Sequence, residues 1–283
     1  MPELPEVETI RRHLAPRVEG RRLGAVAVLD PRWTDPLHPD EAAARLSGRA
    51  IERLGRRGKY LLWELEGDLV LAQHLRMTGT VLYDPPAEPL HTRVRLPLDD
   101  GHGLVVVDPR RFGTGHLLEG GRALTTYFDA RLGLEPLDAR FTPDHLRAMT
   151  RRSRAPIKPF VLDQKRIAGV GNIYADEALF RARLHPLRRA DRLTRAQAAE
   201  LQGALRDVLR DGIDARGASI DDFRDPAGVQ GSFQEAFRVH LRAGEPCPRC
   251  GSAVRKLVVG GRGTYVCERC QPRPRTRRAT PRP

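Results

Sequence analysis

Short runs that alternate apolar and polar residues fill the first half of the chain. In residues 59–65, the side chains of Leu61, Trp63 and Leu65 fall on one side of an extended backbone, as in a strand with one buried face. Candidate strands, several of which alternate in this way, lie at residues 23–29, 51–54, 59–65, 69–75, 80–83, 92–98, 104–108 and 113–118. Short strands at this spacing predict an N-terminal β-sandwich.

A helical pattern over residues 6–14 precedes these strands. Its apolar residues share one face, which we expect to pack on the strands: Leu4, Val7, Ile10 and Leu14. Pro5 suits the first turn of a helix, where a backbone N–H has no intrahelical acceptor. A second, short helix is predicted over residues 42–46, as an insertion among the strands.

Beyond residue 136 the spacing of apolar residues becomes helical. Thr142 is a suitable N-cap residue before Pro143. Helices are predicted to follow over residues 155–164, 172–182 and 194–215. Residues 217–239 have little apolar content and are predicted to form a mobile loop. The chain is therefore predicted to have an α+β multidomain fold, with a β-sandwich and its leading helix followed by helices.

Charge indicates the kind of partner. The 283 residues include 49 Lys and Arg against 36 Asp and Glu, a formal net charge of +13, which favours nucleic acid as the partner. Most of the basic residues are arginine, although a high-GC genome would also enrich arginine. No apolar run has the length of a membrane span, and no signal peptide precedes the start, so we expect a cytoplasmic protein without a membrane partner.

Four cysteines form two CxxC pairs, Cys247 with Cys250 and Cys267 with Cys270, separated by the sixteen residues 251–266. Two such knuckles can complete a tetrahedral thiolate site, so the spacing predicts one structural Zn²⁺. Two disulfides are the alternative, which a reducing cytosol disfavours. Two strands around a basic, glycine-flanked tip at residues 260–263 predict a β-hairpin zinc finger, which we expect to need its metal to fold.

The chain starts Met1-Pro2-Glu3-Leu4-Pro5-Glu6. If Met1 is removed, Pro2 has a free secondary amine beside two carboxylates. An α-amino group has an ordinary pKa of about 7.7–8.0, so much of it is a neutral nucleophile near pH 7. With an aldehyde a secondary amine forms a cationic iminium, which withdraws electrons. The alternative is that Pro2 merely follows the initiator and Pro5 opens a helix.

This start and the finger, together with five internal motifs in the same order, closely resemble the formamidopyrimidine-DNA glycosylases. The internal motifs are Arg57-Gly58-Lys59-Tyr60-Leu61-Leu62, His74-Leu75-Arg76-Met77-Thr78-Gly79, Asp108-Pro109-Arg110-Arg111-Phe112-Gly113, Ile157-Lys158-Pro159 and Gly169-Val170-Gly171-Asn172-Ile173-Tyr174. The resemblance covers nearly the whole chain up to Gln271.

The resemblance implies a base-excision-repair enzyme that is both an N-glycosylase and an apurinic/apyrimidinic lyase. Its expected substrates are 8-oxoguanine and formamidopyrimidines flipped out of double-stranded DNA, and abasic sites. It also implies three parts: a catalytic helix and β-sandwich domain (1–132), a helix–two-turns–helix DNA-binding domain with a lesion-capping loop (133–245) and the zinc finger (246–271). A basic tail (272–283) lies outside the match, and its Arg and Pro content predicts disorder. A monomer is expected, bacterial in type and associated with the nucleoid when bound to DNA.

Catalytic roles carry over to Pro2, Glu3, Lys59 and Arg262. The resemblance implies that the Pro2 nitrogen attacks C1′ of the deoxyribose, and that Glu3 is the acid/base at the sugar. Glu6 is the second carboxylate near the amine. Lys59 matches the general acid of β-elimination, and Arg262 matches the residue assigned to δ-elimination, where binding of the phosphate is the role we favour. From its surroundings alone, a solvated loop arginine is the favoured interpretation of Arg262.

DNA-binding roles carry over to eight residues. Met77, Arg110 and Phe112 match the side chains that fill the gap left by the flipped base, although core packing is the alternative for Met77 and Phe112. The remaining five match residues that contact phosphates: His74, His91, Arg154, Asn172 and Lys256.

One short segment departs from the family pattern: Val239-His240-Leu241-Arg242 stands where the family usually has Val-Tyr-Gly-Arg. His240 stands where the family usually has tyrosine, so the tyrosine contact is lost, although a histidine could still meet a phosphate. The resemblance places the lesion-capping region at residues 230–234, whose sequence varies in the family.

Two other functions compete. One is an endonuclease VIII-like enzyme for oxidised pyrimidines, which Leu4 and the Met77, Arg110 and Phe112 set disfavour. The other is a non-catalytic zinc-ribbon DNA-binding protein, which leaves Pro2 unexplained.

Overall fold

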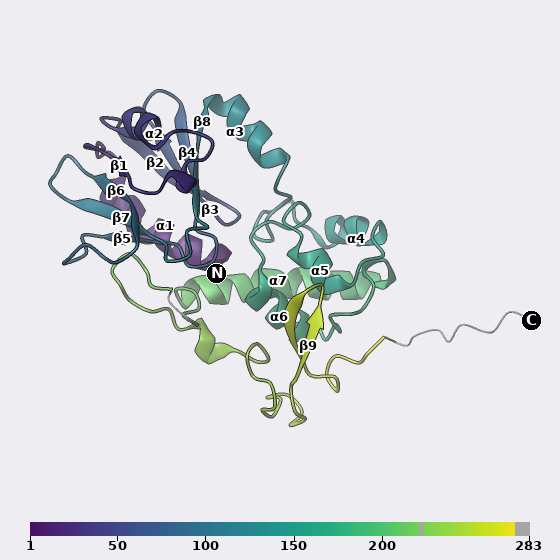
Figure 1. Ribbon diagram of the computed structural model, residues 1–283. Coiled ribbons are helices and arrows are strands. Elements are labelled where there is room, and N and C mark those ends of the chain that lie inside the picture. The colour runs from purple at the N-terminus through teal and green to yellow at the C-terminus, as the bar shows by residue number, and fades with distance from the viewer. Residues whose placement is uncertain (221–222, 275–283) are drawn as a thin grey trace, which may run out of the picture. The chain divides into compact units, whose positions relative to one another are not determined.

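The structure is a computed structural model that describes residues 1–220 and 223–274 (Figure 1). The chain divides into two compact units. The first comprises Met1–Gly133 and Leu209–Ala236, and the second comprises Leu134–Val208 and Phe237–Pro283. Within the described residues, no helix is both long enough and apolar enough to cross a membrane. The predicted basic tail, 272–283, lies outside the described residues from position 275 onward.

Helix α1 (Leu4–Val18) opens the first unit and is longer than the predicted helix. Glu3 is its N-cap residue, and the Glu6 carboxylate accepts a hydrogen bond from the Glu3 N–H at 2.7 Å. This reciprocal capping box explains why the helix starts two residues earlier than the apolar pattern alone indicates. Within the unit, α1 packs against β2 and β3.

Two four-stranded antiparallel sheets form the predicted β-sandwich. One has the order β2 (Ile51–Arg57), β3 (Tyr60–Leu65), β4 (Leu69–His74), β8 (Thr114–Glu119). The other has the order β1 (Ala27–Val28), β6 (Thr92–Pro97), β7 (Gly103–Val107), β5 (Thr80–Tyr83). Seven of these strands overlap most of their predicted ranges, whereas the strand predicted over 23–29 is reduced to β1.

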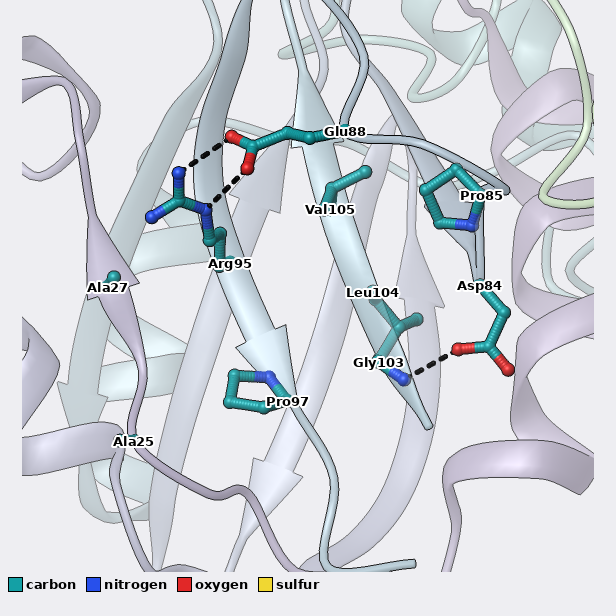
Figure 2. Close-up of a pocket in the computed structure, with 10 residues that line it drawn as sticks. All are labelled: Ala25, Ala27, Asp84, Pro85, Glu88, Arg95, Pro97, Gly103, Leu104 and Val105. Carbon is teal, nitrogen blue, oxygen red and sulfur yellow. Dashed lines mark hydrogen bonds and ion pairs between the residues drawn. The ribbon is translucent and has the colours of Figure 1, made fainter. Parts of the chain in front are cut away.

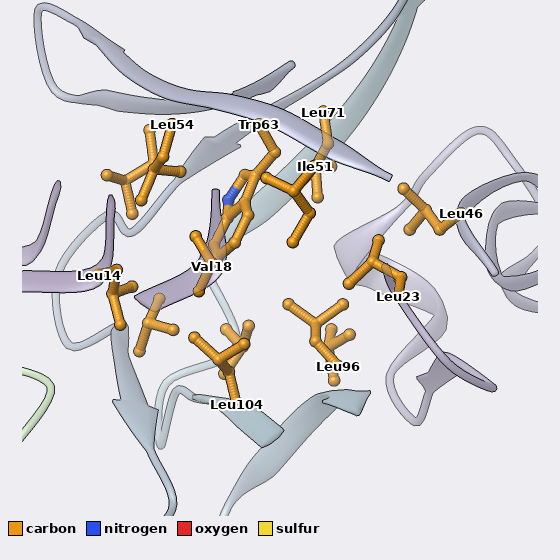
Figure 3. Packing of buried hydrophobic residues seen from close by; sticks show 14 of the residues in the cluster. Leu14, Val18, Leu23, Leu46, Ile51, Leu54, Trp63, Leu71, Leu96 and Leu104 are labelled. Atoms are coloured by element: carbon orange, nitrogen blue, oxygen red, sulfur yellow. The ribbon is translucent and has the colours of Figure 1, made fainter. Parts of the chain in front are cut away.

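The hydrophobic core of this unit combines side chains from α1 and both sheets (Figure 3). Trp63 is 1% exposed, and its indole N–H donates to Gln73 Oε1 at 3.0 Å, which satisfies its polar atom inside the core. Helix α2 (Pro39–Leu46) places Leu46 in the same cluster, as predicted for the insertion. Each fully buried leucine contributes about 1.5–3 kcal/mol, so this cluster is a rigid base for the loops at its edge.

Helix α3 (Gly120–Asp129) follows β8 and was not predicted. Gly120 and Gly121 start it, and adjacent glycines usually indicate a turn. Phe128 is its buried residue, so the helix has too little apolar periodicity to be recognised from sequence.

The second unit contains the predicted helices. They are α4 (Pro143–Arg151), α5 (Ile157–Leu162), α6 (Asn172–Arg181) and α7 (Arg195–Asp214), whose residues from Leu209 group with the first unit. Thr142 caps α4 as predicted, because its hydroxyl accepts from the His145 N–H at 3.2 Å. Helix α5 is shorter than the predicted 155–164, since Pro156 precedes it and Asp163 is extended. Short 3-10 helices occur at η1 (Pro31–Trp33), η2 (Ala190–Arg192) and η3 (Phe233–Ala236).

The hairpin of β9 (Arg255–Val259) and β10 (Arg262–Val266) belongs to the second unit. Its turn is the pair Gly260-Gly261, with φ of 58° and 72°, which is the two-residue turn that suits the twist of a hairpin. The predicted four-residue tip is therefore wrong in detail. Arg262 pairs with Val259 and is the first residue of β10.

Residues 217–239, which were predicted to form a mobile loop, contain buried aromatic side chains and hydrogen bonds within the segment. Phe233 and Phe237 are 1% and 6% exposed, so the segment buries two aromatic rings. The Gly231 N–H donates to the Ser219 hydroxyl at 3.0 Å, which closes part of the loop on itself. Positions 221–222 lie outside the described residues.

Candidate functional site

The N-terminal carboxylates are buried in the first unit. Glu3 is 2% exposed and Glu6 is 1% exposed. Besides holding the Glu3 N–H, Glu6 accepts the Ala218 N–H through Oε1 at 2.8 Å. A side chain at Gly217 would come within 2.8 Å of Glu6, so glycine permits this close approach. Glu6 therefore fixes the backbone beside Pro2.

Pro2 is buried, and its nitrogen is joined to Met1 in the full chain. Met1 is 41% exposed. A processing enzyme can therefore reach the residue whose removal would free the amine.

Lys59 is 5% exposed although it stands in the two-residue turn between β2 and β3. Gly58 precedes it with a φ of 59°. Arg56 ties this turn to α1, because its guanidinium donates to Glu8 Oε2 at 3.1 Å and to the Gly58 carbonyl at 2.9 Å. The predicted general acid thus stands on a turn that is fixed to the helix following Pro2.

Glu8 is the anchor of that arrangement. Burial acts to raise its pKa, but hydrogen bonds from Arg11 and Arg12 and the charge of Arg56 lower it to about 2. Glu8 is therefore ionised at neutral pH, and it holds Arg11 and Arg12 of α1 together with Arg56 of β2.

His74 ends β4 and lies against Tyr60, with ring centroids 4.5 Å apart. Burial, followed by the charges of Arg76 and Lys59, lowers the pKa of His74 to about 3. Its Nδ1 accepts the Arg76 N–H at 2.9 Å, which leaves the proton on Nε2. His74 is therefore a neutral hydrogen-bond donor through Nε2, and its side chain contributes no positive charge to the binding of a phosphate.

Met77 is 37% exposed in the tight turn after β4. The Gly79 N–H donates to the Leu75 carbonyl at 3.0 Å, and a Cβ at Gly79 would lie 2.4 Å from that oxygen. Only glycine closes this turn without strain, so the turn presents Met77 on the surface.

The loop after β7 presents the other two predicted gap-filling residues. Phe112 is 51% exposed, and the Arg110 guanidinium lies 4.9 Å from the centre of its ring. Core packing is therefore excluded for Phe112 and for Met77. His91 is also exposed, with φ of 70°, and its carbonyl accepts the Asp108 N–H at 3.1 Å, which places it beside this loop.

The predicted DNA-contacting residues of the second unit lie on its helices and hairpin. Arg154 precedes α5 and is exposed, as are Lys256 and Arg262 on the hairpin. Asn172 is the first residue of α6, and its Nδ2 donates to the Gly263 carbonyl at 3.0 Å. Its amide is therefore engaged with the hairpin, while the first backbone N–H groups of α6 lack intrahelical acceptors.

Lys158 is a buried residue to which the sequence assigned no role. It is fully buried, and its ammonium group donates to Asp176 Oδ1 at 2.7 Å and to the Gly263 carbonyl and the Thr264 hydroxyl at 2.9 Å each. Lys158 therefore fixes the backbone next to Arg262. The motif Ile157-Lys158-Pro159 was recognised in the sequence, but the sequence did not show that Lys158 is buried.

His240 joins the same network. It is 4% exposed, its Nδ1 lies 2.9 Å from Asp176 Oδ2, and its ring packs against Tyr265 with centroids 5.0 Å apart. Glu177 accepts the backbone N–H of His240 at 2.9 Å. The histidine at this position is thus part of the support beneath the hairpin.

The four cysteines form one cluster, with sulfur atoms within 4.8 Å of one another. Cys247 and Cys270 are 3.9 Å apart, and Cys250 and Cys267 are 3.4 Å apart. A tetrahedral zinc site with Zn–S bonds of about 2.3 Å requires sulfur atoms about 3.8 Å apart, so the cluster fits one zinc ion. All four are free cysteines, which excludes the two disulfides.

A surface pocket of about 420 Å³ lies on the β1-β6-β7-β5 sheet (Figure 2). Arg95 and Glu88 form a paired ion contact at its rim, at 2.8 and 3.1 Å, and Asp84 accepts the Gly103 N–H at 2.8 Å. None of the predicted site residues lines this pocket.

Family models match three successive segments of the chain. They describe the formamidopyrimidine-DNA glycosylase N-terminal domain (residues 1–115), the H2TH domain of the same glycosylase (132–224) and a zinc finger found in FPG and IleRS (244–273). The chain belongs to the formamidopyrimidine-DNA glycosylase family.

Curated family members match over their whole length. The formamidopyrimidine-DNA glycosylase of Chloroflexus aurantiacus is 49% identical over 96% of this chain and 98% of its own. That of Symbiobacterium thermophilum is 46% identical over 100% of this chain and 93% of its own. This coverage places the whole described chain within the family.

Solved structures of the family have the same fold. The crystal structure of the MutM (Fpg) protein of Thermus thermophilus matches with a TM-score of 0.86 and 44% identity, over 95% of this chain and 98% of that one. Lactococcus lactis Fpg in complex with DNA containing an abasic site matches with a TM-score of 0.89 and 33% identity, over 96% and 100%. The predicted fold, a β-sandwich with its leading helix, a helix–two-turns–helix domain and a zinc finger, is confirmed.

Proposed function

We propose that this protein excises oxidised purines, 8-oxoguanine and formamidopyrimidines, from double-stranded DNA and then cleaves the abasic strand through a covalent intermediate on Pro2. Family membership over nearly the whole chain carries this proposal. The burial of Pro2, Glu3 and Lys59 in the first unit supports a role for these residues in the chemistry.

In the proposed reaction, the free Pro2 nitrogen attacks C1′ of the deoxyribose, and the damaged base leaves with the bonding electron pair. Glu3 takes the proton that the attacking amine releases and gives it to the ring oxygen, the sugar opens, and the C1′–N bond becomes an iminium. Glu6 acts through the backbone, because it holds the Glu3 N–H and the Ala218 N–H.

The iminium acidifies the C2′ proton, whose removal expels the 3′ phosphate. Lys59 supplies the proton for that leaving group. A second elimination expels the 5′ phosphate, and Arg262 binds this phosphate. A guanidinium does not readily give up a proton, so its contribution is charge and paired hydrogen bonds.

Met77, Arg110 and Phe112 fill the gap left by the flipped base, and Arg110 bonds the orphaned cytosine. His74, His91, Arg154, Asn172 and Lys256 contact phosphates. The four cysteines hold one structural zinc ion, which maintains the fold of the finger. We place the enzyme in the cytoplasm and retain 1–132, 133–245, 246–271 and 272–283 as its proposed domains.

Borohydride trapping tests the mechanism. The wild-type enzyme and DNA with an abasic site should give a covalent adduct after reduction, and Pro2→Gly or a form that retains Met1 should give none. Lys165→Met, at an exposed lysine, is the matched control and should trap normally. DNA binding without an adduct in the wild type would instead support the non-catalytic zinc-ribbon alternative.

Substrate preference separates the two enzymatic alternatives. The proposed function requires faster excision of 8-oxoguanine opposite cytosine than of thymine glycol. The reverse order would assign the protein to the endonuclease VIII-like activity.

A further inference from the structure

The Asp108 carboxylate organises the loop that carries Arg110 and Phe112. Its Oδ2 accepts the backbone N–H groups of Phe112 at 2.8 Å and Gly113 at 2.7 Å, and its Oδ1 accepts that of Arg110 at 3.2 Å. Asp108 is 1% exposed. A buried carboxylate that collects three amides of one loop fixes the course of the backbone between them.

The same carboxylate reaches a second loop. The Thr78 hydroxyl donates to Asp108 Oδ1 at 2.5 Å, and Thr78 immediately follows Met77. The Arg110 N–H also lies 3.4 Å from the Thr78 hydroxyl oxygen. One carboxylate thus connects the backbone of the Met77 turn to the backbone of the Arg110 and Phe112 loop, and both belong to the first unit.

Between the two exposed side chains, Arg111 fastens the loop from its other side. Its backbone has a φ of 58°, and its guanidinium donates to both oxygens of Asp30 at 2.6 and 2.8 Å. Arg93 Nε donates to the Asp108 carbonyl at 2.8 Å. Because the backbone is held at both ends and in the middle, Arg110 and Phe112 are free to vary only in their side-chain rotamers.

We propose that Asp108 and Thr78 are positioning residues that hold Met77, Arg110 and Phe112 in one arrangement, so that the three side chains enter the DNA together. This inference rests on the proposed gap-filling role of those three residues. A preorganised wedge loses less conformational freedom on binding than two independent loops. Neither Asp108 nor Thr78 has to touch DNA for this effect.

A substitution at Thr78 tests positioning without removing the Asp108 hydrogen bonds that fold the Arg110 loop. The Thr78 side chain contributes only the hydrogen bonds that connect the two loops. Thr78→Val removes the hydroxyl with little change in volume, and Thr78→Ser keeps the hydroxyl. Thr150→Val is the control for loss of a threonine hydroxyl: Thr78 is half-buried and Thr150 is buried, and the Thr150 hydroxyl donates to the Arg147 carbonyl at 2.9 Å in the second unit.

The experiment follows gap filling directly. Duplex DNA with an uncleavable abasic analogue opposite cytosine carries 2-aminopurine next to the gap, and stopped-flow fluorescence records the unstacking of that base when the enzyme binds. We expect Thr78→Val to slow the fluorescence change about tenfold, the size associated with a hydrogen bond to a charged group. Thr78→Ser and Thr150→Val should stay within about twofold of wild type, with all variants compared well below their unfolding temperatures.

A double-mutant cycle tests the path of the effect. If Thr78 acts through the wedge, Thr78→Val should add little to Phe112→Ala, whereas independent effects would multiply. A Thr78→Val variant that behaves as wild type, a Thr78→Ser variant as slow as Thr78→Val, or multiplying effects in the cycle would each overturn the proposal.

Two further readouts keep this proposal separate from the proposed function. Met77→Ala and Phe112→Ala must each diminish the 2-aminopurine change; if they do not, the gap-filling assignment fails, and this inference with it. Borohydride trapping on a single-stranded abasic oligonucleotide, which has no opposite base to replace, should be equal for wild type and Thr78→Val. Loss of trapping in both would overturn the Pro2 mechanism, and loss in Thr78→Val alone would overturn the positioning role.

Discussion

The ammonium group of Lys158 lies 2.7 Å from Asp176 Oδ1, at a place where neither side chain reaches solvent. The pair joins α5 to α6, and the same ammonium group holds the Gly263 carbonyl and the Thr264 hydroxyl of β10. Removal of one partner of a buried ion pair leaves an uncompensated charge, which costs about 3–5 kcal/mol.

Lys158→Met should therefore lower the free energy of unfolding by about 3–5 kcal/mol, measured by urea denaturation. The variant keeps most of the side-chain volume, so the loss reports the charge and its hydrogen bonds. Lys165→Met changes an exposed lysine in the same unit and should alter stability by less than about 0.5 kcal/mol. Equal stability of the two variants would mean that the Lys158 network contributes little.

Buried networks of ion pairs and hydrogen bonds, such as that of Lys158, could not be predicted from the sequence. Apolar runs located seven of the eight sandwich strands because these strands place side chains in the core or against it, whereas the strand predicted over 23–29 is reduced to β1, in which two residues pair with β6. The two CxxC pairs predicted the zinc site because ligand spacing is a local property. In contrast, Asp108 and Lys158 stood in recognised motifs, yet their partners Thr78 and Gly263 are distant in sequence.

Local geometry set the other differences. Arg262 was predicted in the hairpin tip, but the two glycines before it complete the turn with positive φ, and pairing with Val259 brings it into β10. His240 was considered for a phosphate contact, but Asp176 and Tyr265 enclose it. Neither a polar residue's burial nor its partner can be read from residue type alone.

Removal of zinc should unfold the finger and leave the first unit folded. Cys267 is fully buried in a cluster with Val254 and Tyr265, so Cys267→Ser removes both a ligand and the organising centre of this small core. We expect loss of bound zinc and of DNA affinity, measured by metal analysis and by fluorescence anisotropy with labelled abasic DNA.

The two tryptophans of the chain, Trp33 and Trp63, lie in the first unit and provide the internal control. Their emission should stay that of the native protein in Cys267→Ser. Arg269→Ser, at an exposed residue between two ligands, should retain zinc and affinity. A Cys267→Ser protein with unchanged DNA affinity would contradict the structural role of the metal.

The neutral state of His74 predicts an unusual salt dependence. Binding of a phosphate by a cation releases counterions, and each such contact contributes about 0.9 to the slope of log K against log salt. Because the pKa of His74 is lowered to about 3, this residue is uncharged from pH 6.5 to 8. His74→Gln should weaken DNA binding with an unchanged slope, whereas Arg154→Gln should reduce the slope by about 0.9. A slope that falls in His74→Gln would show a charged imidazole in the complex.

The Asp30–Arg111 ion pair predicts how stability depends on acid. The hydrogen bond from Arg111 lowers the pKa of Asp30, against the opposing effect of burial, with further help from the Arg32 N–H. Since the folded pKa lies below the ordinary value of 3.8, the contribution of the pair is fully present above about pH 4 and is lost as pH falls through the folded pKa.

Asp30→Asn should therefore destabilise the protein at pH 7 and bring its thermal midpoint closer to that of wild type as the pH approaches 3. Asp207→Asn, at an exposed carboxylate of α7, should follow the wild-type curve throughout. If the gap between Asp30→Asn and wild type is the same at pH 7 and pH 3, then the Asp30 charge does not stabilise the Arg110 and Phe112 loop, and shape alone holds Arg111 in place.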